Sequence, residues 1–166
     1  MIGVETDVSD DWDSRTDWPA LARSAVHAAI AQSRHPGLID SEVSVKFTSD
    51  AEVRALNAAW RGKDKATNVL SFPMAAEAEL ASAQLLGDIV LAHGVCAGEA
   101  ADRRVQIAIH AAHLVVHGTL HLLGYDHETG DEDAEEMEQV ERRALASMGI
   151  DDPYRVTEVQ FKGPDS

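Results

Sequence analysis

The chain has 166 residues, 45% of them apolar, which is enough for one well-packed domain and too short for two. No stretch approaches the run of about eighteen apolar residues that a membrane span requires, and the acidic N-terminus lacks the basic start and apolar run of a secretory signal, so we expect a cytoplasmic protein with no membrane partner. The net charge of −15 argues at face value against a nucleic-acid partner, because phosphate binding usually needs a basic surface.

The negative charge gathers at the two ends of the chain. Residues 1–20 contain six acidic residues against one basic residue, and residues 128–166 contain twelve against four. The remaining segment, 21–127, has a net charge of only −2, and the sequence RGKDK at 61–65 is locally basic. Acidic ends are usually solubilising surfaces. The total charge therefore does not decide the partner.

The N-terminal part predicts a strand, a helix and a second strand. Residues 2–8, IGVETDV, are a candidate edge strand. Asp17 is expected to cap a helix over residues 18–33, which has a proline in its first turn. Apolar and polar residues alternate over 43–47, which predicts a half-buried strand.

The central part predicts a helix followed by two strands. The helix begins with a capping-box pattern at Ser49 and ends at Gly62. Residues 68–73, NVLSFP, predict a strand closed by proline, and residues 87–92, GDIVLA, predict a more buried one. The stretch between them, 75–86, is expected to be an irregular hairpin or crossover loop.

The C-terminal part predicts two helices. The first runs from about Arg103 to Leu123 and stops at Gly124, and an amphipathic helix follows from about Asp131 to Met148. The single cysteine, Cys96, has no partner for an internal disulfide, so we expect a buried apolar residue.

These elements predict an α+β (mixed α/β) fold in a single domain. We expect a small four-stranded mixed sheet packed with about five helices, and a metal site at the end of the long central helix. The domain is expected to span residues 1–166, with acidic extensions at about 1–16 and 150–166.

Histidines follow one face of the central helix. His113, His117 and His121 are successive i, i+4 neighbours, and His110 falls on the same face. Two imidazoles one helical turn apart can bind a common metal ion, with Zn–N distances of about 2.1 Å. The stripe alone leaves three candidate pairs.

A glycine after the helix favours one of these pairs. Gly124 allows a left-handed turn that directs His127 back towards His117 and His121. The spacing H-x-x-x-H-x-x-G-x-x-H matches the zinc signature of metzincin proteases, and three imidazoles leave a coordination position open for catalysis. We interpret His110 and His113 as members of the stripe or as groups that support the ligands.

One departure from the protease signature changes the expected chemistry. Proteases carry a glutamate after the first histidine as general base, and this chain has Gly118 there. Asp126 or Glu128 could supply a carboxylate, although a role as a turn cap or a solvated acid explains each equally well. Peptide hydrolysis is therefore disfavoured.

Two segments together resemble the YbeY family of bacterial rRNA maturation factors, which are small metal-dependent endoribonucleases. They are RGKDKATNVLSFP at 61–73 and HGTLHLLGYDH at 117–127, and GDIVLA at 87–92 lies where the family has a buried strand. Ala66 replaces the proline that is usual in the family, which removes no polar chemistry.

The resemblance implies a zinc ion, one per chain, held by His117, His121 and His127, although imidazoles also suit other divalent metals. It implies a functionally required arginine at Arg61. It also implies cleavage of single-stranded RNA, in maturation of the 3′ end of 16S rRNA and in ribosome quality control. The expected partners are the small ribosomal subunit and one of its ribosomal proteins.

The residues are compatible with that chemistry. A metal can activate water or assist attack by the RNA's own 2′-hydroxyl, and the guanidinium of Arg61 can pair with two phosphate oxygens at once. Lys63 and Lys65 are candidates for holding neighbouring phosphates, and Ser71 is a candidate for lining the cleft. On residues alone, a basic helix C-terminus that interacts with the helix dipole is the commoner explanation of RGKDK, and only its pairing with the histidine motif favours phosphate binding.

Two other functions fit parts of the pattern. The first is a zinc hydrolase of a peptide or a small phosphoester. The second is a non-catalytic ribosome assembly factor with a structural metal, whose acidic C-terminal helix binds a basic protein. The oligomeric state is not determined by the sequence.

Overall fold

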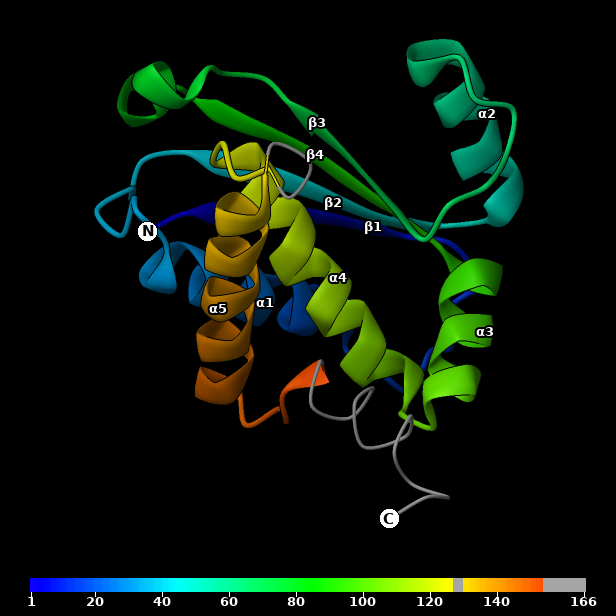
Figure 1. Ribbon diagram of the computed structural model, residues 1–166. Coiled ribbons are helices and arrows are strands. Elements are labelled where there is room, and N and C mark those ends of the chain that lie inside the picture. Colours follow the sequence, from blue (N-terminus) through cyan, green and yellow to red (C-terminus); the bar gives the residue numbers. More distant parts are fainter. Residues whose placement is uncertain (127–129, 154–166) are drawn as a thin grey trace.

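A four-stranded mixed sheet is the frame of the fold (Figure 1). The computed structural model describes residues 1–126 and 130–153. β1, β2 and β4 are parallel, and β3 is antiparallel to β4 at one edge of the sheet. In spatial order the strands are β1 (Gly3–Val8), β2 (Glu42–Thr48), β4 (Leu85–Ala92) and β3 (Val69–Pro73).

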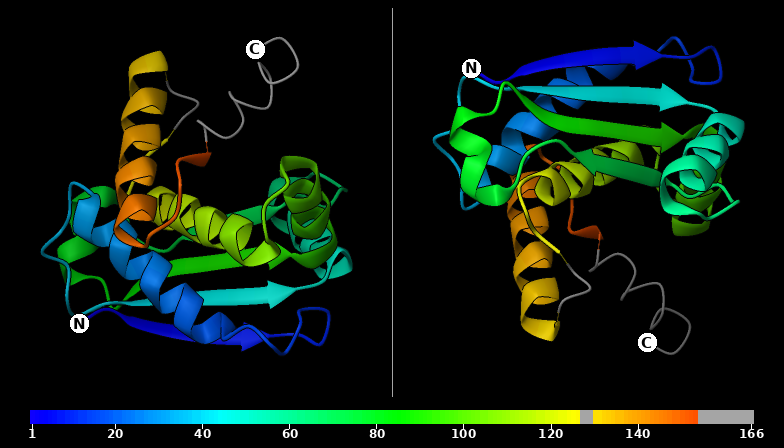
Figure 2. Two further views of the ribbon diagram at one scale, coloured as in Figure 1. Left: turned by 90° about the horizontal axis from the view of Figure 1, so that it is seen from below. Right: turned by 90° about the horizontal axis from the view of Figure 1, so that it is seen from above.

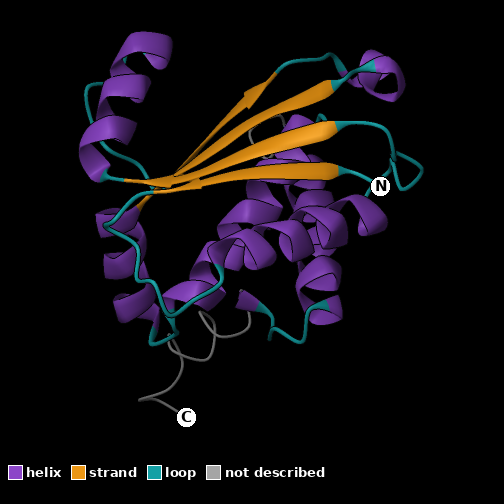
Figure 3. Cartoon of the chain, turned by 180° about the vertical axis from the view of Figure 1, so that it is seen from behind, coloured by secondary structure: helices purple, strands orange, loops and turns teal. Residues whose placement is uncertain are grey.

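Helices cover the two faces of this sheet unequally. The helices are α1 (Trp18–Gln32), α2 (Asp50–Arg61), the 3-10 helix η1 (Glu77–Ser82), α3 (His93–Arg103), α4 (Ile107–Leu122) and α5 (Asp131–Ser147). α1 and α4 pack on one face with α5 against them (Figure 2), whereas α2 stands alone over the far end of the other face (Figure 3). None of the helices in 1–126 and 130–153 has the length and apolar character needed to cross a membrane.

The core lies between the sheet and the α1/α4 layer. Alternate residues of β2, Val43, Val45 and Phe47, are buried there, as the sequence predicts. Trp12 packs edge-on against Trp18 and Phe47, with ring centroids 4.9 and 5.1 Å apart. Burying an aliphatic or aromatic side chain of this size contributes about 1.5–3 kcal/mol. Part of the predicted N-terminal extension is therefore built into the fold, as β1 and as the segment that carries Trp12.

The helix caps follow the sequence closely. The Asp17 carboxylate accepts a hydrogen bond from the Ala20 amide at 3.0 Å, which begins α1. At the start of α2, Ser49 Oγ accepts from the Glu52 amide at 3.2 Å. The reciprocal half of the capping box is absent from the described contacts, because the Glu52 carboxylate instead binds Lys46 and Thr48. Gly62 ends α2 with φ at +69°, a conformation that glycine adopts cheaply.

The fold class, the strands and four helices are confirmed, and one local prediction is wrong. The central helix begins at Ile107 and not near Arg103, and a helix that was not predicted, α3, precedes it. Arg104 separates the two helices with φ at +59°, a left-handed conformation with no glycine to signal it. The hairpin alternative for 75–86 is confirmed, because β3 and β4 are antiparallel neighbours; the connection contains η1, which buried Leu80 anchors, and β4 begins at Leu85, two residues before its predicted start.

Candidate metal centre

His117 and His121 lie one turn apart near the end of α4 and face each other. Their ring centroids are 4.6 Å apart, and the two Nε2 atoms are separated by 3.0 Å. The helix sets this proximity, because residues i and i+4 share one face. The pair that the sequence analysis selected therefore points its nitrogens at a common position.

The outer nitrogens of both rings are held by oxygen atoms. His117 Nδ1 lies 2.8 Å from Glu141 Oε1, and His121 Nδ1 lies 3.0 Å from the Tyr125 carbonyl oxygen. A carboxylate and a carbonyl only accept hydrogen bonds, so each Nδ1 carries the proton and each Nε2 keeps a lone pair.

Such an arrangement fits a cation between the rings. Two lone pairs 3.0 Å apart repel each other unless a positive charge lies between them. In a tetrahedral zinc site, nitrogens about 2.1 Å from the metal lie about 3.4 Å from each other. The His117–His121 pair is therefore close to the geometry that a divalent metal requires.

The third predicted ligand, His127, lies outside the described residues, as does Glu128. Residues 1–126 and 130–153 contain no complete set of three metal-binding side chains. The turn that leads towards His127 has the predicted form, because Gly124 follows the end of α4 with φ at +98°. The role of His127 stays a prediction.

Glu141 of α5 links two histidines beneath the site. Its carboxylate is 1% exposed, with Oε2 2.7 Å from His113 Nε2 and Oε1 2.8 Å from His117 Nδ1. Burial alone would raise the pKa of Glu141, but the hydrogen bonds with His113 and His117 outweigh it and lower that pKa. The group is therefore an anion that accepts from both rings.

Glu141 is not among the site residues predicted from the sequence, although the sequence contains a signal for it. The residue occurs in a helix with many acids, most of which are exposed. It lies four residues after Met137 and three before Ala144, both of which are fully buried, so it falls on the apolar face of α5. A carboxylate on the buried face of an amphipathic helix needs a partner.

The other histidines of the stripe turn away from the site. His110 Nε2 lies 2.8 Å from Glu99 Oε1, and burial lowers the pKa of His110 although Glu99 opposes the shift. Neither His110 nor His113 lines the cavity at the His117–His121 pair. Cys96 is buried as predicted, and burial raises the pKa of its thiol to about 12.

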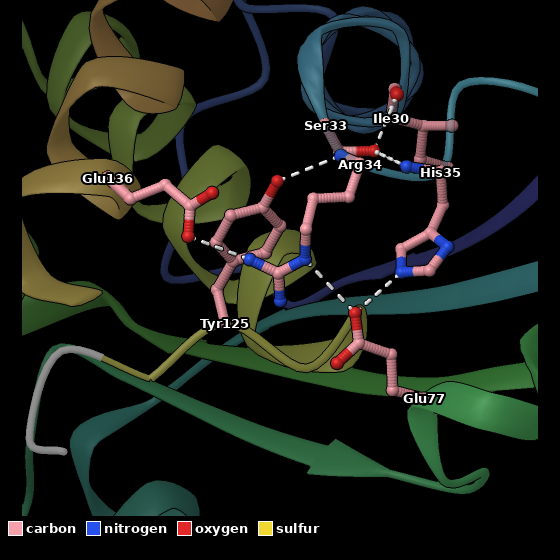
Figure 4. Close-up of polar contacts among 7 residues, drawn as sticks. All are labelled: Ile30, Ser33, Arg34, His35, Glu77, Tyr125 and Glu136. Atoms are coloured by element: carbon pink, nitrogen blue, oxygen red, sulfur yellow. Dashed lines mark hydrogen bonds and ion pairs between the residues drawn. The ribbon is translucent and has the colours of Figure 1, made fainter. Parts of the chain in front are cut away.

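Tyr125, whose carbonyl holds His121, is fixed by a cluster shown in Figure 4. The Arg34 guanidinium lies 3.9 Å from the centre of the Tyr125 ring, and the Arg34 amide donates to the Tyr125 hydroxyl at 2.8 Å. Arg34 also binds Glu77 of η1 at 3.1 Å and Glu136 of α5 at 2.9 Å. The turn after α4 is thus fastened to three other elements.

A cavity of about 630 Å³ opens over the two histidines. The structure brings together here all the described site residues that the sequence singled out: Arg61, Lys63, Lys65, Ser71, His117 and His121. Arg61 Nη2 donates to the Ser71 carbonyl oxygen at 2.6 Å, which anchors the guanidinium at the cavity wall.

The charge of this cavity differs from that of the whole chain. Its described lining contains three cationic side chains, Arg61, Lys63 and Lys65, and one carboxylate, Asp126. Among the described contacts, none of the three cations has an ion pair. A protein with a net charge of −15 therefore presents a basic cavity.

Gly118 lies where a side chain would be tightly packed. A Cβ at this position would lie 3.0 Å from both Ser71 Oγ and Ile89 Cγ2, because α4 packs closely on β3 and β4 here. A glutamate at this position, the general base of the protease signature, would therefore require the Ser71 and Ile89 side chains to shift.

Comparisons with known proteins find one family. The family model described as Endoribonuclease YbeY matches residues 6–149. The Endoribonuclease YbeY of Rhizorhabdus wittichii is 52% identical over 95% of this chain and 99% of its own length. That of Novosphingobium aromaticivorans is 50% identical over 92% of this chain and 96% of its own length.

A solved structure shares the fold. The solution structure of TM1509 from Thermotoga maritima aligns with a TM-score of 0.56 over 89% of this chain and 91% of that chain. The sequence identity is 24%, so this likeness concerns the arrangement of helices and strands alone.

Proposed function

The chain belongs to the endoribonuclease YbeY family, and we propose that it is a metal-dependent endoribonuclease that cleaves single-stranded RNA during rRNA processing. The finer assignment is maturation of the 3′ end of 16S rRNA together with ribosome quality control. The observation that carries the proposal is the joint position of three cationic side chains and two imidazoles whose Nε2 atoms face each other in one cavity.

The proposed ligands are His117, His121 and His127, and the proposed metal is zinc, one ion per chain. When bound, the ion supplies Lewis acidity to a phosphodiester and makes a nucleophilic oxygen more acidic. Glu141 and the Tyr125 carbonyl keep the proton of each ring on Nδ1, so that both Nε2 atoms are available as ligands.

Arg61 is proposed to stabilise the negative charge that builds on the phosphate oxygens. One of its N–H groups is held by the Ser71 carbonyl, and the planar guanidinium has further N–H groups that can pair with two oxygens. Because the anchor fixes the guanidinium before substrate binds, little reorganisation is needed when charge develops.

Lys63 and Lys65 line the same cavity and are proposed to hold the phosphates on either side of the cleaved bond. Such contacts supply affinity that falls as salt concentration rises. Ser71 contributes through its backbone carbonyl, which anchors Arg61. Its side-chain hydroxyl lies against Gly118.

Peptide hydrolysis is not proposed for this cavity. The position of the protease general base is Gly118, which has no carboxylate and which packs closely on side chains of β3 and β4. Phosphodiester cleavage instead uses the cationic groups that the cavity contains.

The cellular setting is also a proposal. An rRNA-processing enzyme meets its substrate in assembling ribosomes, so we place the protein in the cytoplasm with the small ribosomal subunit and one of its proteins as partners.

A cleavage assay on single-stranded RNA joined to elemental analysis tests the function. The wild type is expected to hold about one metal per chain and to cleave the RNA. His121→Ala is expected to lose both metal and cleavage. Arg61→Ala is expected to keep the metal and to lose about 100- to 1000-fold in kcat, the usual effect of removing a charge-stabilising donor.

Matched variants outside the cavity serve as controls. His27→Ala removes a histidine of α1 that bonds the Ile2 carbonyl, and Arg23→Ala removes an exposed arginine of the same helix. Both are expected to cleave like the wild type. Undiminished cleavage by metal-free His121→Ala would overturn the proposed function.

A further inference from the structure

A second groove lies on the outer face of the sheet, where α2 stands over β2, β4 and β3. Its volume is about 740 Å³. Two of the large apolar residues that are most exposed in the described chain lie on its rim, Trp60 at 73% and Met74 at 60%. Phe72 of β3 and Leu56 of α2 add further apolar wall. An exposed apolar patch of this kind marks a binding surface.

The groove is continuous with the cavity of the candidate metal centre. Arg61, Ser71 and Pro73 line both spaces. The Arg61 guanidinium bridges them, because it donates to the Ser71 carbonyl and also lies 5.6 Å from the centre of the Phe72 ring. If an RNA strand places a phosphate at Arg61, its neighbouring nucleotides therefore lie beside the groove.

The two spaces have different chemistry. The metal-centre cavity is lined by Arg61, Lys63 and Lys65, which attract phosphates. In the groove, the one lysine, Lys46, is paired with Glu52 at 2.7 Å. The groove also contains the carboxylate of Asp88, which repels phosphates. An uncharged, flat, apolar group suits the groove, whereas a phosphate suits the cavity.

We propose that the groove is a nucleobase-stacking subsite, in which Trp60 and Phe72 receive unpaired bases of the RNA strand whose phosphate contacts Arg61. This inference rests on the proposed endoribonuclease function and extends it. Every base has a π face, so stacking on aromatic side chains needs no particular sequence. Bases within a duplex are already stacked on their neighbours, so the subsite favours single strands.

The fluorescence of Trp60 gives a direct readout of this subsite. Trp12 and Trp18 are 3% and 2% exposed, whereas Trp60 is 73% exposed, so a neutral quencher such as acrylamide reaches mainly Trp60. A short single-stranded RNA with hydrolysis-resistant phosphorothioate linkages is the probe. Binding to the metal-loaded protein is expected to change the Trp60 emission and to protect it from acrylamide.

Variants and a modified probe separate stacking from phosphate binding. Trp60→Ala is expected to weaken binding roughly 5- to 150-fold, the range for loss of one stacked base, and Trp60→Phe is expected to restore most of it. A probe with abasic sites keeps its phosphates, so it is expected to bind the wild type and Trp60→Ala equally. Ile39→Ala, which removes an exposed apolar residue away from the groove, is the control.

Two results would overturn the subsite. The first is an unchanged dissociation constant for Trp60→Ala with the intact probe. The second is quenching of Trp60 by a basic peptide and not by RNA, which would make the groove a protein-docking surface. Because these are binding measurements, either result alongside normal RNA cleavage would leave the proposed function standing.

Discussion

At the scale of single residues, the metal centre depends on an acid that binds no substrate. Glu141 uses one oxygen for His117 and the other for His113, so both rings are oriented by one buried anion. A carboxylate in this position fixes the tautomer of the ligand and makes its Nε2 a better donor to a metal.

Glu141→Gln tests this dependence. Glutamine keeps the shape but replaces one of the two carboxylate oxygens with an NH2 donor, so one of the two rings faces a donor in place of an acceptor. We expect affinity for zinc to fall about 10- to 100-fold, the usual effect of losing a group that orients a ligand. A chelator-competition titration measures it, and the nitrogen chemical shifts of His117 report whether its proton leaves Nδ1.

Glu99→Gln provides the matched comparison. Glu99 binds His110, a histidine of the same helix that does not line the cavity. The zinc affinity of the Glu99→Gln variant is expected to equal that of the wild type. Equal zinc affinity for Glu141→Gln and the wild type would show that Glu141 does not position the ligand.

At the scale of elements, regular patterns are what the sequence predicts well. The ligand pair was predictable because histidines four residues apart share one face of a helix, and because the glycine after α4 indicates where the chain turns. α3 was missed because its boundary is Arg104, where tertiary packing imposes a left-handed residue that no local signal announces. Contacts between distant segments, such as Arg34 with Glu77 and Glu136, have no sequence spacing to reveal them.

The contact of Glu77 in η1 with Arg34 and His35, which follow α1, is expected to depend on pH. The hydrogen bond with His35 lowers the pKa of Glu77 below its usual 4.5; burial opposes the shift and Arg34 adds to it. Because the folded pKa is the lower one, the stability that Glu77 adds is present above about pH 4.5 and is lost as pH falls through the folded pKa.

We therefore expect Glu77→Gln to reduce the free energy of unfolding by about 0.5–1 kcal/mol at pH 7, a size limited by the partial exposure of the pairs. The difference from the wild type should shrink below pH 4.5. Urea unfolding at pH 7, 5 and 4 measures it. Glu79→Gln, an exposed acid of the same 3-10 helix, should match the wild type throughout. A difference that grows on acidification would contradict the assignment.

At the scale of the whole molecule, the net charge is negative while the local charge of the cavity is positive. Most of the −15 comes from the two terminal segments, whereas the cavity contains three cationic side chains that have no ion pair in the described chain. Local potential, more than net charge, governs where a polyanion binds. RNA binding to this protein is therefore expected to concentrate at the cavity.

The apolar core joins the layers of the fold without the described candidate metal ligands. One buried apolar cluster extends from Ile2 in the N-terminal segment to Leu145 in α5, and it joins the sheet to the α1/α4/α5 layer. The described candidate ligands, His117 and His121, lie near the C-terminal end of α4 and are not part of that cluster. A chain of this size buries enough apolar area to fold alone.

Removal of the metal is therefore expected to lower the melting temperature without unfolding the protein. A metal at 100 times its Kd adds about 2.7 kcal/mol, and about 2–4 °C per kcal/mol applies to a chain of this length. We expect a chelator to lower Tm by roughly 5–11 °C and to leave the circular dichroism at 25 °C unchanged. His121→Ala should show no chelator-dependent shift, and His27→Ala should shift like the wild type. Unfolding at 25 °C on chelation would mean instead that the metal is structural, because ligand loss would then remove the folding free energy itself.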